Sequence, residues 1–202
     1  VLHEEAPGQE SVEFWRARMA GFDPQTLELG IGTPQTAQPE LAGAQVTHTL
    51  SPRAAAVVRR LQKELRAPEA VVLLAAYFLL LSAHGAGPDL TVGSPVNVRP
   101  PEAQRAIGYH VNVLPLRLRV EPQESFGSLV RTARDTFFDA LVHSQVPVDS
   151  ISGLVPRADA SWRGTLFRHL FNYVPNFGMP DFDLAGLRAR PLVARNGFSK
   201  FE

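Results

Sequence analysis

The residues of this sequence that could do chemistry are a histidine and an asparagine inside an apolar run. His110 and Asn112 lie in IGYHVNVLPLRLRV, residues 107–120. A histidine in such surroundings can take up a proton as a general base, or its ring can shape a binding site without reacting. A third interpretation is that both residues face solvent on one side of a sheet. The run by itself leaves the three interpretations open.

Several common catalytic sites have no supporting motif in the chain. The six histidines lack the HExxH or HxH spacing that holds a metal ion, and no glycine-rich phosphate-binding pattern is present. The stretch TVGSP, residues 91–95, places a proline after its serine, which does not fit the elbow of a serine hydrolase. The sequence has no cysteine, so a disulfide framework, a thiolate metal site and a cysteine nucleophile are excluded.

Length and composition bound the class of protein. The 202 residues are enough for one domain, and 45% of them are hydrophobic. The 20 basic and 20 acidic residues balance, which gives no indication of a nucleic-acid or membrane partner. The N-terminus has no apolar segment, and the longest apolar run, residues 71–82, is shorter than the roughly 20 residues that cross a bilayer. We expect a cytoplasmic protein.

The elements that would position the polar residues alternate between helices and strands. The apolar spacing and the turn residues predict helices over 10–20, 51–65, 68–84, 125–142 and 148–155, and strands over 46–50, 90–93, 107–120, 166–174 and 187–193. Residues 23–44 read as a long irregular connection. This order predicts the α/β class, as an α+β layered sandwich with a mixed sheet and helices packed on one face.

Serines mark the expected starts of three helices. Ser11 stands before the first, Ser51 with Pro52 before the second, and Ser125 before the long fourth helix. Within the predicted strand 107–120, odd-numbered and even-numbered side chains point to opposite faces. We therefore expect an apolar face and a reverse face that carries the polar residues.

Five segments together resemble a known family. They are FWRARMAG (14–21), DLTVGSPVNVR (89–99), IGYHVNVLPLRL (107–118), HSQVPVDSISGLV (143–155) and TLFRHLFNYVP (165–175). In this order and with these gaps they are similar to motifs of the condensation domain of nonribosomal peptide synthetases, specifically of its C-terminal part. Each segment alone is weak, whereas the five in order are specific.

The resemblance implies a fold and a division of the chain. The family has two lobes, each similar to chloramphenicol acetyltransferase, with the active site in a tunnel between them. Residues 1–22 would be an interlobe helix or linker, and residues 23–202 a C-terminal lobe truncated at its C-terminal end. The family's catalytic HHxxxDG motif would precede this segment and is not in it. We expect no catalytic residue here, and an inactive segment when it is alone.

The resemblance also implies roles for particular residues. Arg99 would form a structural salt bridge with the aspartate of the HHxxxDG motif across the two lobes; otherwise it is a surface arginine after a strand. The remaining positions fall into a loop beneath the tunnel, called the floor loop, and the tunnel wall: Gly93, Ser94, Pro95 and Asn97 for the loop, and His110, Asn112 and Asn172 for the wall. No metal ligand is expected.

The implied reaction joins two carrier-bound substrates. A donor acyl or peptidyl thioester would be attacked by an acceptor amine, giving an amide bond in natural-product biosynthesis. The substrates arrive on phosphopantetheine arms of carrier proteins, so no directly bound cofactor is expected; the carrier proteins and the N-terminal lobe would be the partners.

His110 stands where the family usually has phenylalanine, and Val148-Asp149 replaces a Phe-Glu pair. These departures leave open a free-standing acyltransferase that uses CoA or a carrier. Two further alternatives are a non-catalytic recruitment domain and the epimerisation branch of the fold.

Overall fold

The computed structural model describes residues 7–30, 42–155, 165–175, 182–184, 186–189 and 197–198. Its main sheet has the strand order β2-β1-β3. β1 (Asp89–Asn97) pairs antiparallel with β2 (Val111–Arg119), and β3 (His169–Leu170) pairs parallel with β1. β4 (Phe182–Leu184) and β5 (Leu187–Ala189) form a separate antiparallel pair. The expected mixed sheet is confirmed.

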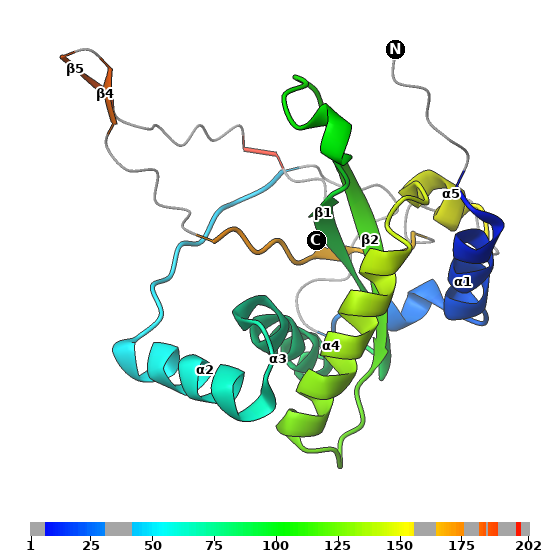
Figure 1. Ribbon diagram of the computed structural model, residues 1–202. Coiled ribbons are helices and arrows are strands. Elements are labelled where there is room, and N and C mark those ends of the chain that lie inside the picture. The colour runs from blue at the N-terminus through cyan, green and yellow to red at the C-terminus, as the bar shows by residue number, and fades with distance from the viewer. Residues whose placement is uncertain are drawn as a thin grey trace.

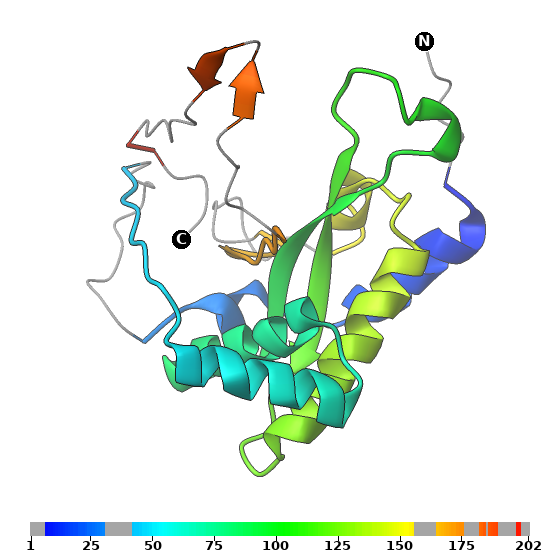
Figure 2. The ribbon, with the colours of Figure 1, turned by 60° about the vertical axis from the view of Figure 1, so that its left-hand side comes forward.

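Helices form a layer on one face of this sheet (Figures 1 and 2). α4 packs along β2, α3 lies beside α4, and α2 packs against α3. Two 3₁₀ turns and two shorter helices complete the described elements. The bounds are α1 Gln9–Met19, η1 Pro24–Leu27, α2 Pro52–Leu65, α3 Glu69–Ala83, η2 Pro101–Ala103, α4 Phe126–Val142 and α5 Val148–Ser152.

The core lies between the helices and the even-numbered side chains of β2. Leu114, Leu116 and Leu118 are almost completely buried, and Leu90 and Val92 of β1 lie opposite Leu118 and Leu116 on the same face. The face that was expected to be polar is therefore the core face, and that prediction was wrong. His110 and Asn112 stand at one end of this face, and the residues that follow them on it are buried leucines. The two polar residues therefore gave a wrong impression of the whole face.

Two of the three predicted serine caps are confirmed. The Ser51 hydroxyl accepts a hydrogen bond from Ala54 N at 3.2 Å, and the Ser125 hydroxyl accepts one from Ser128 N at 3.2 Å. Ser11 is not a cap, because α1 begins two residues earlier after Gly8. Its hydroxyl instead lies 2.9 Å from Nδ1 of His143.

Strand boundaries account for most of the other differences. Residues 46–50 form no strand. A few residues earlier in the chain, Ala42 pairs with Phe198 in an isolated antiparallel β-bridge. β1 continues four residues beyond the predicted end at 93, while β2 begins four residues later than predicted. Of the predicted strand 166–174 only β3 forms, and residues 190–193 lie outside the described residues. A β strand extends only as far as a neighbouring strand pairs with it, and the sequence of one segment does not show where that pairing ends.

α1 packs into the same hydrophobic core as the rest of the fold. Trp15 and Met19 are buried in it, and Trp15 Nε1 donates to the carbonyl oxygen of His143 at 2.9 Å. The boundary expected after residue 22 stays a prediction. α1 therefore shares the hydrophobic core of the rest of the fold.

No single helix of the described residues is long and apolar enough to cross a membrane. α2 and α3 meet the criterion only as a pair, by length and composition, and the pair bends by 109° at its break.

Arg66, directly after α2, has a left-handed backbone conformation with φ of +48°. Glycine usually occupies such a position, because a side chain there costs about 1 kcal/mol. We predict that Arg66→Gly raises the free energy of unfolding by up to about 1 kcal/mol, measured by urea denaturation. Lys63→Gly, inside the same helix, should lower it by about 1 kcal/mol. Equal signs for the two variants would contradict the assignment of strain to Arg66.

Candidate functional site

The hairpin of β1 and β2 extends beyond the helical layer and ends in a connection over residues 98–110 (Figures 1 and 2). We call residues 98–110 the hairpin tip. Ile107 is fully exposed, and Tyr109 is 83% exposed. Large apolar side chains in water are usual one at a time, but two of them on a projecting tip suggest a contact surface.

Arg99 fixes the shape of the hairpin tip from inside. Its Nη1 donates to the carbonyl oxygens of Ala103, at 2.9 Å, and Ala106, and its Nη2 donates to that of Gly108 at 3.2 Å. The Arg99 side chain is half-buried. A planar cation that binds three carbonyl oxygens holds them in one arrangement. The structure thus gives Arg99 a local bracing role, and the expected interlobe salt bridge stays a prediction.

The residues expected to form the floor loop lie in a strand. Gly93, Ser94, Pro95 and Asn97 all belong to β1, so no loop forms at these four positions. β1 continues because β2 pairs with it as far as Asn97, whose partner is Val111. The loop that leaves the body is the hairpin tip, which follows these residues.

Gly93 lies at a close approach between the sheet and the segment before β3. A Cβ atom at Gly93 would lie 2.6 Å from the Phe167 ring, and the Gly93 carbonyl oxygen accepts a hydrogen bond from Phe171 N at 2.8 Å. The glycine therefore makes room for an aromatic ring against β1.

Asn112 joins β2 to the connection between α4 and α5. Its Nδ2 donates to the carbonyl oxygens of Ser144 and Val146 at 2.8 and 2.7 Å. Its Oδ1 accepts from Val148 N at 3.1 Å and from its neighbour Val113 N at 3.0 Å. The Asn112 side chain, expected to line the tunnel wall, thus binds backbone groups of its own chain.

The other two residues expected to line the tunnel are not brought together. His110 is half-buried at the foot of the hairpin tip, where its carbonyl oxygen accepts from Val98 N at 3.0 Å. Its imidazole makes no hydrogen bond to any described residue. Asn172 is exposed just after β3, and β1 separates β3 from β2. Neighbouring strands lie about 5 Å apart, so Asn172 and His110 are on different sides of the sheet's central strand.

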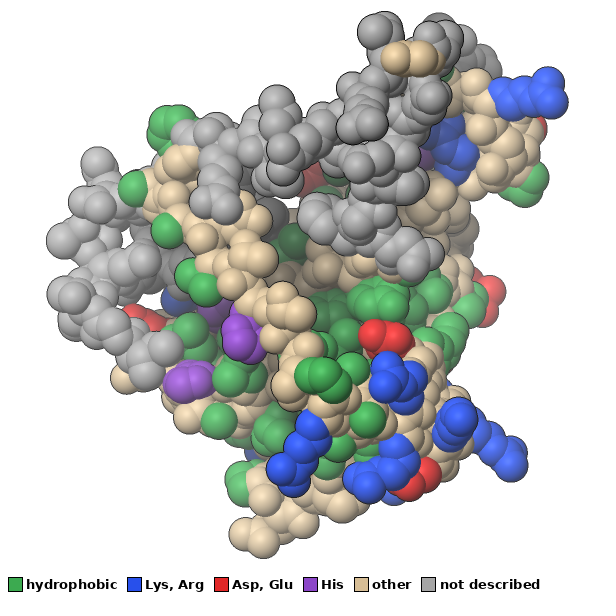
Figure 3. Space-filling model, turned by 90° about the vertical axis from the view of Figure 1, so that its left-hand side faces the viewer, with side chains coloured by type: hydrophobic (Ala, Val, Ile, Leu, Met, Phe, Trp, Pro, Cys, Tyr) green, Lys and Arg blue, Asp and Glu red, His purple; other side chains and the backbone are tan. Residues whose placement is uncertain are grey.

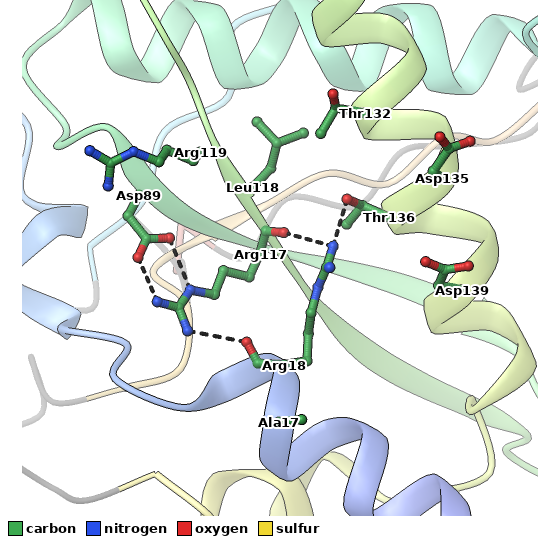
Figure 4. A pocket seen from close by; sticks show the side chains of 10 residues that line it. All are labelled: Ala17, Arg18, Asp89, Arg117, Leu118, Arg119, Thr132, Asp135, Thr136 and Asp139. Atoms are coloured by element: carbon green, nitrogen blue, oxygen red, sulfur yellow. Dashed lines mark hydrogen bonds and ion pairs between the residues drawn. The ribbon is translucent and has the colours of Figure 1, made fainter.

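A charged hollow of about 640 Å³ lies where α1, β2 and α4 meet (Figure 4). Arg117 forms its floor: Nε and Nη2 bind the two carboxylate oxygens of Asp89 at 2.9 and 2.6 Å. Nη1 donates to the carbonyl oxygens of Arg18 and Ala20 at 3.1 and 2.7 Å, and the guanidinium lies 5.3 Å from the centre of the Phe22 ring. Arg117 thereby joins the start of β1 to the C-terminal end of α1.

Arg18 crosses the same hollow toward α4. Its Nη2 donates to Thr136 Oγ1 at 2.6 Å and to the carbonyl oxygen of Arg117 at 3.2 Å. Burial lowers the pKa of the Arg18 guanidinium from its ordinary value, Asp139 opposes this shift, and Arg117 adds to it. The guanidinium stays charged at neutral pH. It therefore binds an outward-facing carbonyl of the strand and a hydroxyl of the helix at once.

A serine and a histidine also meet at the other end of α1, where Ser11 contacts His143. The His143 ring stacks on Phe14 with a centroid distance of 4.1 Å, and its carbonyl oxygen binds Trp15. No carboxylate orients this histidine within the described residues, as a catalytic serine–histidine pair requires. The contact fastens α1 to the end of α4.

The charged hollow and the α1 contacts were missed by sequence reasoning. Asp89, Arg117 and Arg18 stand in three of the quoted segments, DLTVGSPVNVR, IGYHVNVLPLRL and FWRARMAG. An acidic residue at the start of one strand and an arginine near the end of its antiparallel partner could have indicated the first pair. Nothing local indicates Arg18.

The described residues provide contact surfaces and joints, and they contain no group of three or more His, Cys, Asp or Glu that could hold a metal ion. The hairpin tip offers the exposed side chains of Ile107 and Tyr109 on a braced loop, and the imidazole of His110, at the end of this tip, makes no hydrogen bond to any described residue.

Comparison with known proteins identifies the family. The condensation domain model matches residues 2–184, so the chain belongs to the condensation domain family. It is 30% identical over 179 residues to a probable non-canonical nonribosomal peptide synthetase, CymA, of Salinispora arenicola, covering 88% of this chain and 2% of that protein. It is 30% identical over 152 residues to phosphinothricin tripeptide synthetase PhsC of Streptomyces viridochromogenes, covering 75% of this chain and 14% of that protein. The chain thus spans a small part of these relatives.

Solved structures agree on the fold. The chain superposes on a four-domain nonribosomal peptide synthetase bound to AMP and glycine with a TM-score of 0.74 at 17% identity, covering 86% of this chain and 13% of that one. On the X-domain from teicoplanin biosynthesis the TM-score is 0.67 at 24% identity, covering 81% and 35%. The expected family and fold class are confirmed.

We predict that Gly93→Ala lowers the free energy of unfolding by about 1–3 kcal/mol, because the new methyl group overlaps the Phe167 ring. Gly108→Ala is the control: its Cβ would meet only His110, whose Nε2 lies at an ordinary 3.5 Å. Denaturant melts of the two variants measure the difference, and adding Phe167→Leu should recover part of the loss in Gly93→Ala. A Gly93→Ala protein as stable as the parent would contradict the close approach.

The two arginines at the end of β2 should differ in their contribution. We predict that Arg117→Gln lowers the free energy of unfolding by about 2–4 kcal/mol, because it leaves a largely buried Asp89 and two carbonyl oxygens without their cation. Arg119→Gln, which removes an exposed pair with Glu121, should cost no more than about 0.5 kcal/mol. Similar losses of stability in the two variants would contradict the view that the pair of Arg117 and Asp89 holds α1 to the sheet. Thermal unfolding of both variants makes the comparison.

Proposed function

We propose that this chain is the C-terminal lobe of a condensation domain that forms an amide bond in nonribosomal peptide synthesis. The observation that carries the proposal is the hairpin tip, where Arg99 braces a projecting loop with Ile107 and Tyr109 exposed. A loop held this firmly, with apolar side chains in water, suits a surface that meets another part of the same domain. The family match over residues 2–184 supports it.

In this proposal the tip crosses to the N-terminal lobe and forms the floor of the tunnel. Arg99 has bonds from Nη1 and Nη2 to its own loop. Within the described residues its Nε makes none, so a donor is left for the aspartate of the HHxxxDG motif. The Arg99 salt bridge would then fix the tip against the lobe that carries the catalytic histidines.

The substrates are two carrier proteins with loaded phosphopantetheine arms. The acceptor amine attacks the donor thioester carbonyl, the C–N bond forms, and the C–S bond breaks to release the donor thiol. The amine proton passes to a histidine of the N-terminal lobe and on to the leaving sulfur. On this side of the tunnel, His110 would shape the acceptor pocket with an imidazole ring where the family usually has phenylalanine. The reaction takes place in the cytoplasm.

Charge at the hairpin tip should abolish the reaction of the complete domain. We predict that Ile107→Asp with Tyr109→Asp lowers the rate of amide formation by about 100-fold or more, since a misplaced wall misaligns the reacting groups. Product is followed by mass spectrometry with two loaded carrier proteins. Val142→Asp is the control, because Val142 is also exposed, at 76%, but lies at the end of α4.

Two outcomes would overturn the proposal. One is an unchanged rate in the tip variant of the complete domain. The other is amide formation by the 202-residue chain alone, which would place the catalytic groups within it. A complete domain that folds and binds carrier proteins but forms no amide would instead favour the recruitment function.

A further inference from the structure

The outer side of α2 carries an excess of positive charge that the rest of the chain does not share. The chain as a whole is neutral, with 20 basic and 20 acidic residues. Helix α2 and its capping residue carry one carboxylate, Glu64, against five cations: Arg53, Arg59, Arg60, Lys63 and Arg66. Figure 3 shows basic side chains gathered at one end of the face that α2 occupies.

Three of these cations follow one another toward the C-terminal end of α2. Arg59 and Lys63 are four residues apart, the spacing of neighbours on a helix surface, and Arg66 caps the helix three residues further on. All three side chains are exposed, and no carboxylate of the described residues pairs with any of them. Glu64 instead lies 3.5 Å from Arg60, on the adjacent line. We call Arg59, Lys63 and Arg66 the cationic row.

α4 extends the same surface. Gly127 in its first turn approaches α2 closely: a Cβ there would lie 3.4 Å from Leu65 Cδ2 and 3.8 Å from Arg131 Nη1. The exposed guanidinium of Arg131 therefore lies near Leu65, at the C-terminal end of α2. Two helices thus contribute to one positive surface.

The backbone at Arg66 is an independent observation. Its left-handed conformation suits glycine, and an arginine there makes the helix end less stable than it could be. A strained residue with an exposed, unpaired charge suggests that the side chain is retained for something outside the chain. Backbone strain and an exposed positive charge thus occur together at Arg66.

We propose that the cationic row is a docking site for an acidic helix on another protein, with carboxylates spaced to meet Arg59, Lys63 and Arg66. The arginine fork binds a carboxylate through two parallel hydrogen bonds, so two of the three positions favour this ligand. The row spans about 10 Å, two turns of a partner helix.

A protein partner is favoured over a polyanion such as DNA or a lipid membrane. Binding to a phosphate backbone depends on many cations spread over a long surface and on an overall positive field. The chain has no net charge, and the row has three cations with Arg131 beside it. This inference does not depend on the proposed amide-forming function.

The test measures the binding of a helical peptide of about 20 residues, with both ends blocked, to the 202-residue chain. Fluorescence anisotropy of the labelled peptide reports the binding. The peptide carries glutamate along one face at alternating intervals of four and three residues, and a matched peptide has glutamine there. We expect the glutamate peptide to bind at least tenfold more tightly, with an affinity that falls as salt rises from about 0.05 to 0.3 M.

Charge-reversal variants of α2 test whether the peptide binds at the cationic row. Arg59→Glu with Lys63→Glu should weaken the glutamate peptide at least tenfold, and Arg53→Glu, at the other end of α2, should change it less than threefold. Arg66→Gly should weaken the peptide about threefold while raising the midpoint of urea unfolding, a combination that a purely structural role for Arg66 would not give.

Three results would overturn the proposal: equal binding of the glutamate and glutamine peptides, equal effects of the two ends of α2, or tighter binding of a duplex DNA or an anionic lipid vesicle than of the glutamate peptide. Because Arg66→Gly is expected to be more stable than the parent, loss of binding in that variant cannot come from unfolding.

Discussion

The pairing register of β1 and β2 is the constraint on which the rest of the structure depends. Asp89 lies opposite Arg119 and Asn97 opposite Val111, so nine residue pairs run from the core to the hairpin tip. A shift by one residue would turn Leu114, Leu116 and Leu118 away from α4 and bring the odd-numbered residues, including Arg117, into the core. The same register puts Arg117 within reach of Asp89 and carries Arg99 to the base of the tip.

Polar side chains then join the layers by binding backbone groups. Asn112 holds the α4–α5 connection, Arg117 holds the end of α1, and Arg18 binds both β2 and α4. Each of these groups is half-buried, where an unsatisfied polar atom is costly and a satisfied one fixes a geometry. The result is a rigid body around the hairpin, which allows a short braced tip to act as a contact surface at a distance from the core.

Two surfaces remain directed away from this body, and they differ in chemistry. The hairpin tip is braced by Arg99 and exposes Ile107 and Tyr109, which suits a permanent contact within one domain. The cationic row on α2 is charged and exposed, which suits a partner that associates and leaves, because such contacts speed encounter more than they hold a complex. Their separation on the fold would allow a domain to keep its own lobes together while it exchanges a partner elsewhere.

The sequence by itself determined the main helices and the family. Apolar spacing and the Ser51 and Ser125 caps predicted α2, α3 and α4, because a helix is specified by residues three and four apart. Five short segments indicated the condensation domain before any fold was known.

Only the tertiary structure decided which face of β2 is buried, where β1 ends, and what Asn112 and Arg117 bind. Arg117 and its acceptor in Arg18 are 99 residues apart, and Asn112 and Val148 are 36 apart. Local patterns carry no information about partners at that distance, because these contacts exist only after the layers have packed.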